Sequence, residues 1–421
     1  MNRKEFTGRL QSLLTSDLWN VVVLAVVTAL LFAPAIFRDD FRDLLYHTTA
    51  ALDPDITRAA STGYPLFHMT VRALVMLCSI PPFAAGVLVA TIAKLALAVS
   101  VYLLLRRPPH HITPAGPNSA FVLSLVLCLL GPINLFTLPH VYLGYLAPNV
   151  VHNPTIIMMV PFALWESVML GYLLVSPRPS GRQLSLAAVL VVLSSLAKPS
   201  FNLAAIPAFC LVLLLQLVAK ERSFWSALRA GSVIVVPVVA LSLMQFWLLF
   251  GRWSGVTSTT PSEVLVAPFT VLKVQSGGSL SLAIFKICAS LGIPIVGLFL
   301  FRKSQHVPKA SRTILLFCAL TLVAALSQAV LFVEQSEGRS ISDGNFLWGA
   351  SSALFIASFA VVLTLFDLKL RPSQWFAQIG RPYRPILLVL GFSVLGGLLV
   401  MRPLLPSNTL VMQVRTMLFG H

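Results

Sequence analysis

Residues 18–47, LWNVVVLAVVTALLFAPAIFRDDFRDLLYH, decide the fold class of this chain. Apart from Asn20 and Thr28, residues 18–37 of this stretch are apolar. That is the length an α-helix needs to cross the hydrocarbon core of a bilayer, which is roughly 30 Å thick. The charged residues that follow directly mark the point where such a helix leaves the membrane. The stretch therefore predicts a membrane-spanning helix that ends in a polar loop.

Apolar runs of the same kind recur along the 421-residue chain, of which 57% is hydrophobic and only 10% is charged. Soluble domains carry about 25% charged residues, so the composition excludes a soluble enzyme, a disordered chain and a coiled coil. The runs are continuous rather than alternating, which indicates helices rather than strands. We therefore expect an all-α integral membrane protein with about eleven transmembrane helices. The predicted spans are 18–37, 82–105, 119–138, 154–175, 184–197, 200–219, 230–250, 281–301, 313–333, 345–366 and 385–401.

The distribution of charge predicts the orientation of these spans. The chain has 30 lysine and arginine residues against 14 aspartate and glutamate residues. Basic loops are retained in the cytoplasm, so this excess needs no nucleic-acid partner. With the N-terminus in the cytoplasm, most basic residues fall in inner loops and most acidic residues in outer loops. An odd number of spans then places the C-terminus outside.

Residues 64–80 are predicted to form a helix that lies along the outer membrane surface. The segment is short, ends at Pro81 and Pro82, and carries His68 and Arg72 on one face at i, i+4 spacing. Its other face is apolar and consists of Phe67, Val71, Leu74 and Cys78. Amphipathic helices of this kind lie in the interface, so we expect the first outer loop to contain interfacial helices.

The first outer loop, residues 38–63, holds carboxylates at the membrane surface. If the loop is helical, Asp39, Asp43 and His47 share one face. Its apolar side would consist of Phe41, Leu44, Leu45, Thr48 and Leu52. Neighbouring acids raise one another's pKa and can poise one of them as a general base, so Asp39, Asp40 and Asp43 are candidate catalytic residues. The alternative is that Asp39 and Asp40 only cap a helix N-terminus.

Two further segments on the predicted outer side carry polar groups suited to sugar and phosphate. His152 and Asn153 end the loop 139–153, and Pro154 fixes their position by starting the next helix. Lys198 is flanked by apolar residues, and an ionisable group at such a position must pair or face a wet cavity. It could hold a lipid-linked phosphate as a point charge. The alternatives are an interfacial aromatic belt for the loop and snorkelling for the lysine.

A third outer segment, the loop 334–349, is rich in polar residues for so apolar a chain. Its arginine could bind a phosphate through its forked guanidinium group, and its acids could orient sugar hydroxyls. The alternative is a solvated connector with a Ser-Asp-Gly turn. The candidate binding residues of this loop are Glu334, Glu337, Arg339, Asp343 and Asn345.

The order of these pieces resembles the C-type membrane glycosyltransferases, which include protein O-mannosyltransferases and lipid A aminoarabinose transferases. The resemblance rests on the acidic pair Asp39-Asp40, the surface-helix start Gly63-Tyr64-Pro65-Leu66-Phe67, and a crossing that ends in Arg106-Arg107. Residues 193–207, LSSLAKPSFNLAAIP, also look like the L-x-K-P joint of that family. The chain differs in having Tyr-Pro-Leu where the family has a double proline.

This resemblance implies a sugar transferase that uses a polyprenyl-phosphate-linked donor. A loop-one carboxylate would act as the base or bind a metal, His68 and Arg72 would join the donor-binding residues, and the acceptor would be a lipid, a glycan or a protein. The expected location is the inner membrane of a bacterium, in synthesis of the cell envelope. No cofactor is required by the sequence, and a divalent cation such as Mg²⁺ or Mn²⁺ is left open.

The expected organisation is one polytopic domain over residues 1–421, with a transferase-like core at 18–250 and C-terminal helices at 251–421. Two other functions fit the same composition. A transporter or flippase of lipid-linked sugars would show repeats or discontinuous helices. A polysaccharide polymerase or ligase would carry a long outer loop late in the chain, and the longest here, about 251–280, is modest.

Overall fold

The computed structural model describes residues 3–38, 43–53, 65–108, 112, 114–131, 145–148, 153–250, 263–303, 307–335, 345–367 and 384–401. The first part of the chain is helical throughout these residues. Its helices are α1 (Arg3–Arg38), α2 (Asp43–Ala51), α4 (Pro65–Cys78), α5 (Pro82–Arg106), α6 (Pro117–Cys128), α7 (Pro154–Val175), α8 (Gly181–Ala197), α9 (Asn202–Val218) and α10 (Phe224–Phe250).

The second part of the chain adds further helices and two short strands. They are β1 (Glu263–Val266), α11 (Thr270–Val274), α12 (Leu280–Ser290), α13 (Gly292–Lys303), α14 (Lys309–Leu331), β2 (Phe332–Gln335), α15 (Asn345–Asp367) and α17 (Arg384–Met401).

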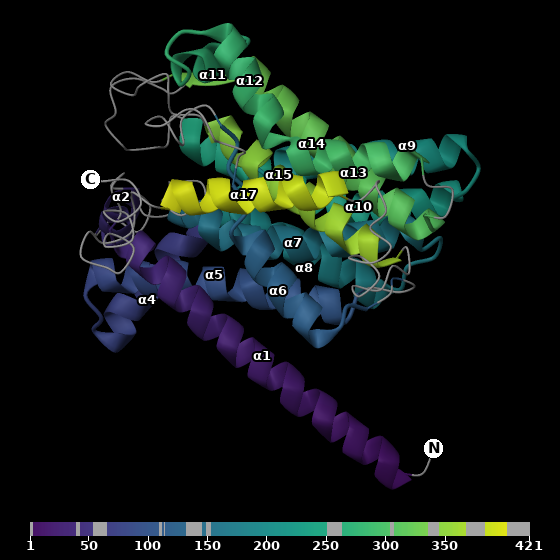
Figure 1. The fold of residues 1–421 in the computed structure, drawn as a ribbon. Coiled ribbons are helices and arrows are strands. Elements are labelled where there is room, and N and C mark those ends of the chain that lie inside the picture. The colour runs from purple at the N-terminus through teal and green to yellow at the C-terminus, as the bar shows by residue number, and fades with distance from the viewer. Residues whose placement is uncertain are drawn as a thin grey trace.

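The long helices form a bundle in which α7 has a central position (Figure 1). It packs against α5 and α8 from the first part of the chain and against α14 and α15 from the second. α14 lies between α9 and α15, while α1 packs on α5 and extends away from the bundle toward its N-terminus (Figure 1). The C-terminal helices are therefore packed directly on the N-terminal ones.

Six described helices are long and apolar enough to cross a membrane, which indicates a multi-pass membrane protein. They are Asp17–Phe37, Pro82–Arg106, Pro154–Val175, Phe224–Gln245, Lys309–Leu331 and Phe346–Leu365. The predicted count of about eleven is not reached among the described residues. Helices α6, α8, α9 and α17 are apolar but shorter than the usual span over their described residues.

The predicted span 281–301 is broken in the structure rather than continuous. α12 and α13 are separated at Leu291 and bent by 60° to each other. Pro294 lies in the first turn of α13 and has no backbone N–H to continue the hydrogen bonding of α12, so the break has a local cause. The predicted break near Lys198 and Pro199 is confirmed, because α8 ends at Ala197 and α9 begins at Asn202.

The two strands were not predicted from the sequence. β1 and β2 pair antiparallel, with Val264 opposite Glu334 and Val266 opposite Phe332. The pairing joins the segment before α11 to the end of α14, both of which were predicted to lie outside. It therefore fixes the start of the polar loop that contains Glu334.

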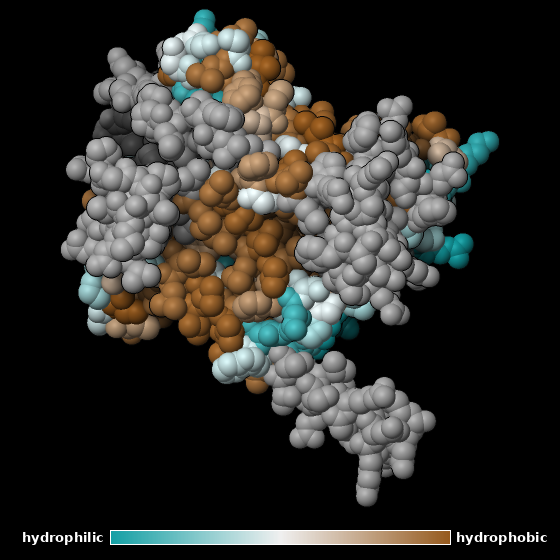
Figure 2. Space-filling view, viewed as in Figure 1, coloured by the Kyte–Doolittle hydropathy of each residue, from teal (hydrophilic) through white to brown (hydrophobic). Residues whose placement is uncertain are grey.

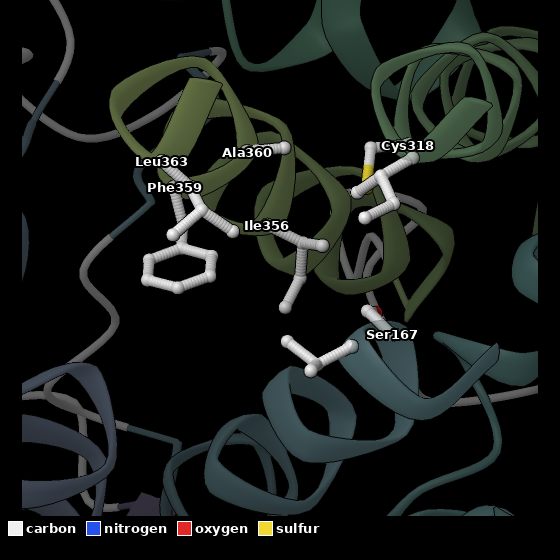
Figure 3. Close-up of a pocket in the computed structure, with 8 residues that line it drawn as sticks. Ser167, Cys318, Ile356, Phe359, Ala360 and Leu363 are labelled. Carbon is white, nitrogen blue, oxygen red and sulfur yellow. The ribbon is translucent and has the colours of Figure 1, made fainter. Parts of the chain in front are cut away.

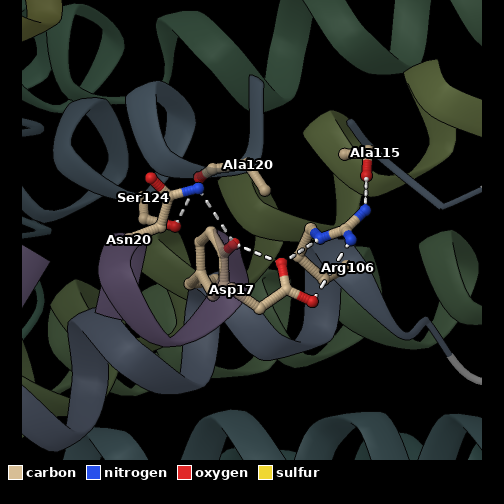
Figure 4. Close-up of polar contacts among 7 residues, drawn as sticks. Asp17, Asn20, Arg106, Ala115, Ala120 and Ser124 are labelled. Carbon is tan, nitrogen blue, oxygen red and sulfur yellow. Dashed lines mark hydrogen bonds and ion pairs between the residues drawn. The ribbon is translucent and has the colours of Figure 1, made fainter. Parts of the chain in front are cut away.

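A half-buried ion pair joins α1 to the C-terminal end of α5 (Figure 4). Arg106 at the end of α5 donates to Asp17 of α1 over 2.8 Å, and Tyr102 donates its hydroxyl to the same carboxylate over 2.6 Å. Helices α2 and α4 lie in the segment that connects α1 to α5. They are therefore at the opposite end of the bundle from this ion pair. A full crossing by residues 64–80 would have separated Arg106 from Asp17.

Further contacts gather at the same end as this ion pair. Arg222 donates to the carbonyl oxygens of Leu173, Leu174 and Ser176 and so caps the C-terminus of α7. Lys309 lies 2.9 Å from Glu221 in an ion pair. All of these residues come from predicted inner loops, or from helix ends beside them.

The face of the bundle seen in Figure 2 is largely apolar where it is described, as expected for a surface in contact with lipid. On α1 the exposed side chains recur every three or four residues and form one stripe: Leu18, Val22, Val26 and Leu30. α10 exposes Val236, Val239 and Leu243 in the same way. In water such patches would cause aggregation, so they support a bilayer around these helices.

We predict that Thr49 and Ser223 lie on opposite sides of the membrane. Thr49 is exposed on α2 and Ser223 is exposed just before α10. In a background where the native cysteines are serines, Thr49→Cys should react in intact cells with an impermeant thiol reagent. Ser223→Cys should react only after the cells are permeabilised. Equal reaction of both in intact cells would contradict the predicted topology.

Candidate functional site

Asp43 and Asn153 come from distant parts of the chain and meet at one end of the bundle. Asp43 is the first residue of α2 and is half-buried. Asn153 is the N-cap of α7, where its Oδ1 accepts from the Ile156 amide at 3.1 Å. Its Nδ2 then donates to Asp43 Oδ2 over 3.5 Å. The helix cap thus orients the asparagine so that its amide group faces the carboxylate. α7 begins at Pro154, as the sequence predicted.

Lys198 lies in the turn between α8 and α9 and is only 4% exposed. Its backbone N–H caps α8 by donating to the Ser194 carbonyl. Its ammonium nitrogen is 6.0 Å from the centre of the Trp348 ring, in the first turn of α15. A buried lysine is costly unless compensated, and an aromatic face supplies part of that compensation.

Two carboxylates act on this buried cation. Burial lowers the pKa of the Lys198 ammonium group to about 8, while the nearby Asp43 and Glu334 carboxylates act in the opposite direction and favour its charged form. Glu334 is half-buried on β2. The site therefore combines Asp43, Asn153, Lys198 and Glu334, four residues that the sequence singled out separately, from four separate segments.

The turn that carries Lys198 touches the start of α15 very closely. Gly349 faces the carbonyl oxygen of Ser200, and a Cβ atom at position 349 would lie 2.6 Å from that oxygen. Only glycine allows this approach without a backbone shift. The contact sets the relative position of Lys198 and Trp348.

We predict that Gly349→Ala lowers stability by about 1–3 kcal/mol, because the added methyl group overpacks this contact. Thermal unfolding in detergent measures the effect. Gly391→Ala is the matched control, since a Cβ atom there meets nothing within 4 Å. An unchanged melting temperature for Gly349→Ala would show that the two segments can separate without cost.

His47 and His68 are buried together, although His68 was predicted to lie on the polar face of residues 64–80. His47 Nδ1 and His68 Nε2 lie 3.0 Å apart and share a hydrogen bond, and His68 is fully buried. Arg72 donates to the backbone carbonyl of Asp53 over 2.8 Å and so ties α4 to the end of α2. The contacts of His68 and Arg72 thus hold the first outer loop together, and neither residue directly contacts the four site residues through a described hydrogen bond.

The predicted apolar faces of both helices are confirmed in part. Leu44 and Thr48 of α2 and Phe67 and Val71 of α4 are buried as predicted, whereas Leu45 and Cys78 are exposed. Both helices pack on α5 and on each other, and Leu44 and Thr48 face Gly86 of α5.

Several predicted site residues lie outside the described residues: Asp39, Asp40, His152, Glu337, Arg339 and Asp343. Asn345 begins α15. The roles predicted for these residues remain predictions. They flank the described site in sequence, since Asp39 and Asp40 precede Asp43, and His152 precedes Asn153.

No protein-family model and no curated protein matches the sequence. The chemistry of the site must therefore be argued from its own residues.

The described residues do not suit a divalent metal ion. Among them, no three histidine, cysteine, aspartate or glutamate side chains gather in one place. Lys198 already supplies a positive charge that acts with Asp43 and Glu334, and a second cation beside it would be repelled. We therefore derive no step through a metal.

Sequence reasoning missed Trp348 and Lys286. Lys286 of α12 is 1% exposed, donates to the Gln275 carbonyl over 3.3 Å, and lies 5.2 Å from the centre of the Tyr145 ring. Tyr145 is also buried. The sequence could have indicated Lys286, because it is an ionisable residue inside a predicted membrane span.

A small hollow between α7, α14 and α15 is not a second site (Figure 3). Its lining is apolar except for Ser167, whose hydroxyl donates to the Ala163 carbonyl, and the thiol of Cys318. Neither group is placed to bind a charged substrate, so we attribute the hollow to imperfect packing.

Proposed function

We propose that the chain is a membrane glycosyltransferase that moves a sugar from a polyprenyl-phosphate donor to an acceptor hydroxyl on the extracytoplasmic face. One observation carries this proposal. A carboxylate with an oriented partner, Asp43 with Asn153, lies near a buried cation, Lys198, at the polar end of an apolar bundle. A lipid-linked phosphate enters from the bilayer and a polar acceptor from water, so both can reach this end.

The proposed chemistry is a single displacement. Asp43 takes the proton from the acceptor hydroxyl, and the acceptor oxygen attacks the anomeric carbon of the sugar. The bond between that carbon and the phosphate oxygen breaks, and polyprenyl phosphate leaves with the electron pair. Lys198 stabilises the negative charge on the leaving phosphate. Direct displacement inverts the configuration of the anomeric carbon.

Three neighbouring residues have supporting roles in this proposal. Asn153 holds the Asp43 carboxylate through its amide N–H group. Glu334 is placed to accept hydrogen bonds from sugar hydroxyls. Trp348 offers an aromatic face beside Lys198. The acceptor, whether lipid, glycan or protein, would approach over the loops that border these residues.

Release of polyprenyl phosphate tests the proposal. Purified protein in lipid nanodiscs should release it from one or more polyprenyl-phosphate sugars when membrane extract supplies the acceptor. Heat-denatured protein is the control. Failure of every donor with a common hexose, pentose or aminosugar to turn over would contradict the proposal.

Transport of a lipid-linked sugar is the second candidate function, and the bent pair α12–α13 favours it. Discontinuous helices are common at transporter binding sites, and this pair carries the buried Lys286 close to its break. A flippase would move the intact donor across a vesicle membrane without release of polyprenyl phosphate. The same donors, reconstituted in liposomes, therefore distinguish the two functions.

A further inference from the structure

Glu166 is a carboxyl group in the interior of the bundle that the proposed transfer does not use. It lies within α7, which is one of the candidate spans, and its side chain is 0% exposed. Neither of its oxygens has a hydrogen-bond partner among the described residues. The groups that act on Glu166 include no cation, and the Lys94 ammonium group of the neighbouring α5 lies over the Phe32 ring at 5.0 Å.

Ser194 and Asn202 are the polar side chains that act on the Glu166 carboxyl group. Both are neutral donors, so neither supplies a countercharge for a carboxylate. Asn202 Nδ2 is already used, because it donates to the Val191 carbonyl at 3.0 Å and to Ser195 Oγ at 2.8 Å. Its Oδ1 is a further buried acceptor without a partner in the described part of the chain.

Gln245 extends this cluster from α10. Its Nε2 donates to the Ser195 carbonyl over 2.8 Å, and its Oε1 also has no partner among the residues described. The side-chain oxygens without partners in this region thus belong to Glu166, Asn202 and Gln245, and all of them are acceptors. A carboxylate here would be a fully buried negative charge without a countercharge among the described groups that act on it.

We propose that Glu166 is a buried proton-binding site, occupied at neutral pH. The carboxylate takes up one proton from water, becomes a neutral carboxylic acid, and donates its O–H group to the Oδ1 atom of Asn202. An unpaired ionised carboxylate in an apolar interior is far more costly than a neutral acid with one hydrogen bond. The proton also satisfies the Asn202 acceptor.

The bound proton links the interior of the bundle to the α8–α9 turn. Asn202 is the first residue of α9, and its hydrogen bonds hold the end of α8. The hydrogen bond from Glu166 adds α7 to this connection. This inference concerns the protonation of one side chain and stands whether or not the chain transfers a sugar.

Infrared spectroscopy measures the protonation state directly. The spectrum of wild-type protein in lipid at neutral pH, minus that of Glu166→Gln, should contain the carbonyl stretch of a protonated carboxyl group. Glutamine has the shape of the neutral acid, so the variant should fold. Carboxylate stretches in the difference spectrum would overturn the proposal.

Carbodiimide labelling gives a second test that needs no variant. Dicyclohexylcarbodiimide reacts with protonated carboxyl groups in apolar surroundings, so Glu166 should be labelled in wild-type protein and detected by mass spectrometry of the α7 peptide. The exposed carboxylate of Glu221 is the internal control and should stay unmodified. Absence of label on Glu166 would overturn the proposal. Protection of Glu166 by sodium chloride but not choline chloride would assign a metal ion in place of the proton and would also overturn it.

Discussion

Replacement of Asp43 by asparagine should reduce sugar transfer by about 10²–10⁴-fold, the usual range for loss of a general base. The amide has nearly the same shape but cannot accept the proton of the acceptor hydroxyl. The new amide group can present its oxygen to Asn153 Nδ2, which keeps both this hydrogen bond and the α7 cap, so folding should be preserved. The measurement is the rate of polyprenyl phosphate release by purified Asp43→Asn protein that still binds the donor.

Asp53→Asn is the matched control for this variant. Asp53 lies at the end of the same loop helix, and Arg72 binds its backbone carbonyl, which the substitution leaves unchanged. This variant should retain its transfer rate. Asp39→Asn and Asp40→Asn are informative beside it, because the resemblance to C-type transferases assigns the base to one of these two residues or to Asp43. Full activity of Asp43→Asn with loss in Asp40→Asn would move the base to the earlier position.

Lys198→Met should reduce transfer by about 10²–10³-fold, the loss typical when one group that stabilises a developing negative charge is removed. Methionine retains the apolar stem but not the cation, so the leaving phosphate loses its partner. Lys309→Met is the control, since Lys309 is an exposed lysine in an ion pair at the other end of the bundle. Equal rates for Lys198→Met and wild type would exclude a role for this lysine in leaving-group stabilisation.

The protonation of Lys198 predicts a pH dependence for the same reaction. Because burial lowers the pKa of the ammonium group to about 8, its positive charge is present below that pH and lost above it. Transfer should therefore fall as the pH rises through about 8. Lys198→Arg keeps its charge throughout this range, so any activity it retains should not fall there. The profile separates loss of this charge from general inactivation at high pH.

The residues of the candidate site could be singled out from the sequence, but the geometry around them could not. Asp43, Asn153, Lys198 and Glu334 could be chosen because polar groups are rare in so apolar a chain and because the topology placed all four on one side. Their proximity depends on the packing of α7, α8 and α15, which hydropathy does not encode. Trp348 was not predicted for that reason, because aromatic residues near helix ends are common at membrane interfaces whether or not they bind a substrate.

Local features of the sequence explain why some elements were not predicted. The strands β1 and β2 are four residues each, and β2 directly continues the apolar run of α14, so neither shows a clear strand period. The break between α12 and α13 could have been predicted from Pro294, but the length of the apolar run favoured one crossing. The buried His47–His68 pair could not have been predicted, because periodicity indicates the helix face on which a residue lies but not the residue that it contacts.

A structure of the protein with a polyprenyl-phosphate sugar bound tests the central claim most directly. We expect the phosphate in contact with Lys198 Nζ, the sugar between Asp43 and Trp348, and the anomeric carbon open to an acceptor beside the Asp43 carboxylate. The lipid tail should lie along the apolar outside of the bundle. Donor density against α12 and α13 near Lys286, with none beside Asp43 and Lys198, would contradict the account and support transport of the intact lipid-linked sugar.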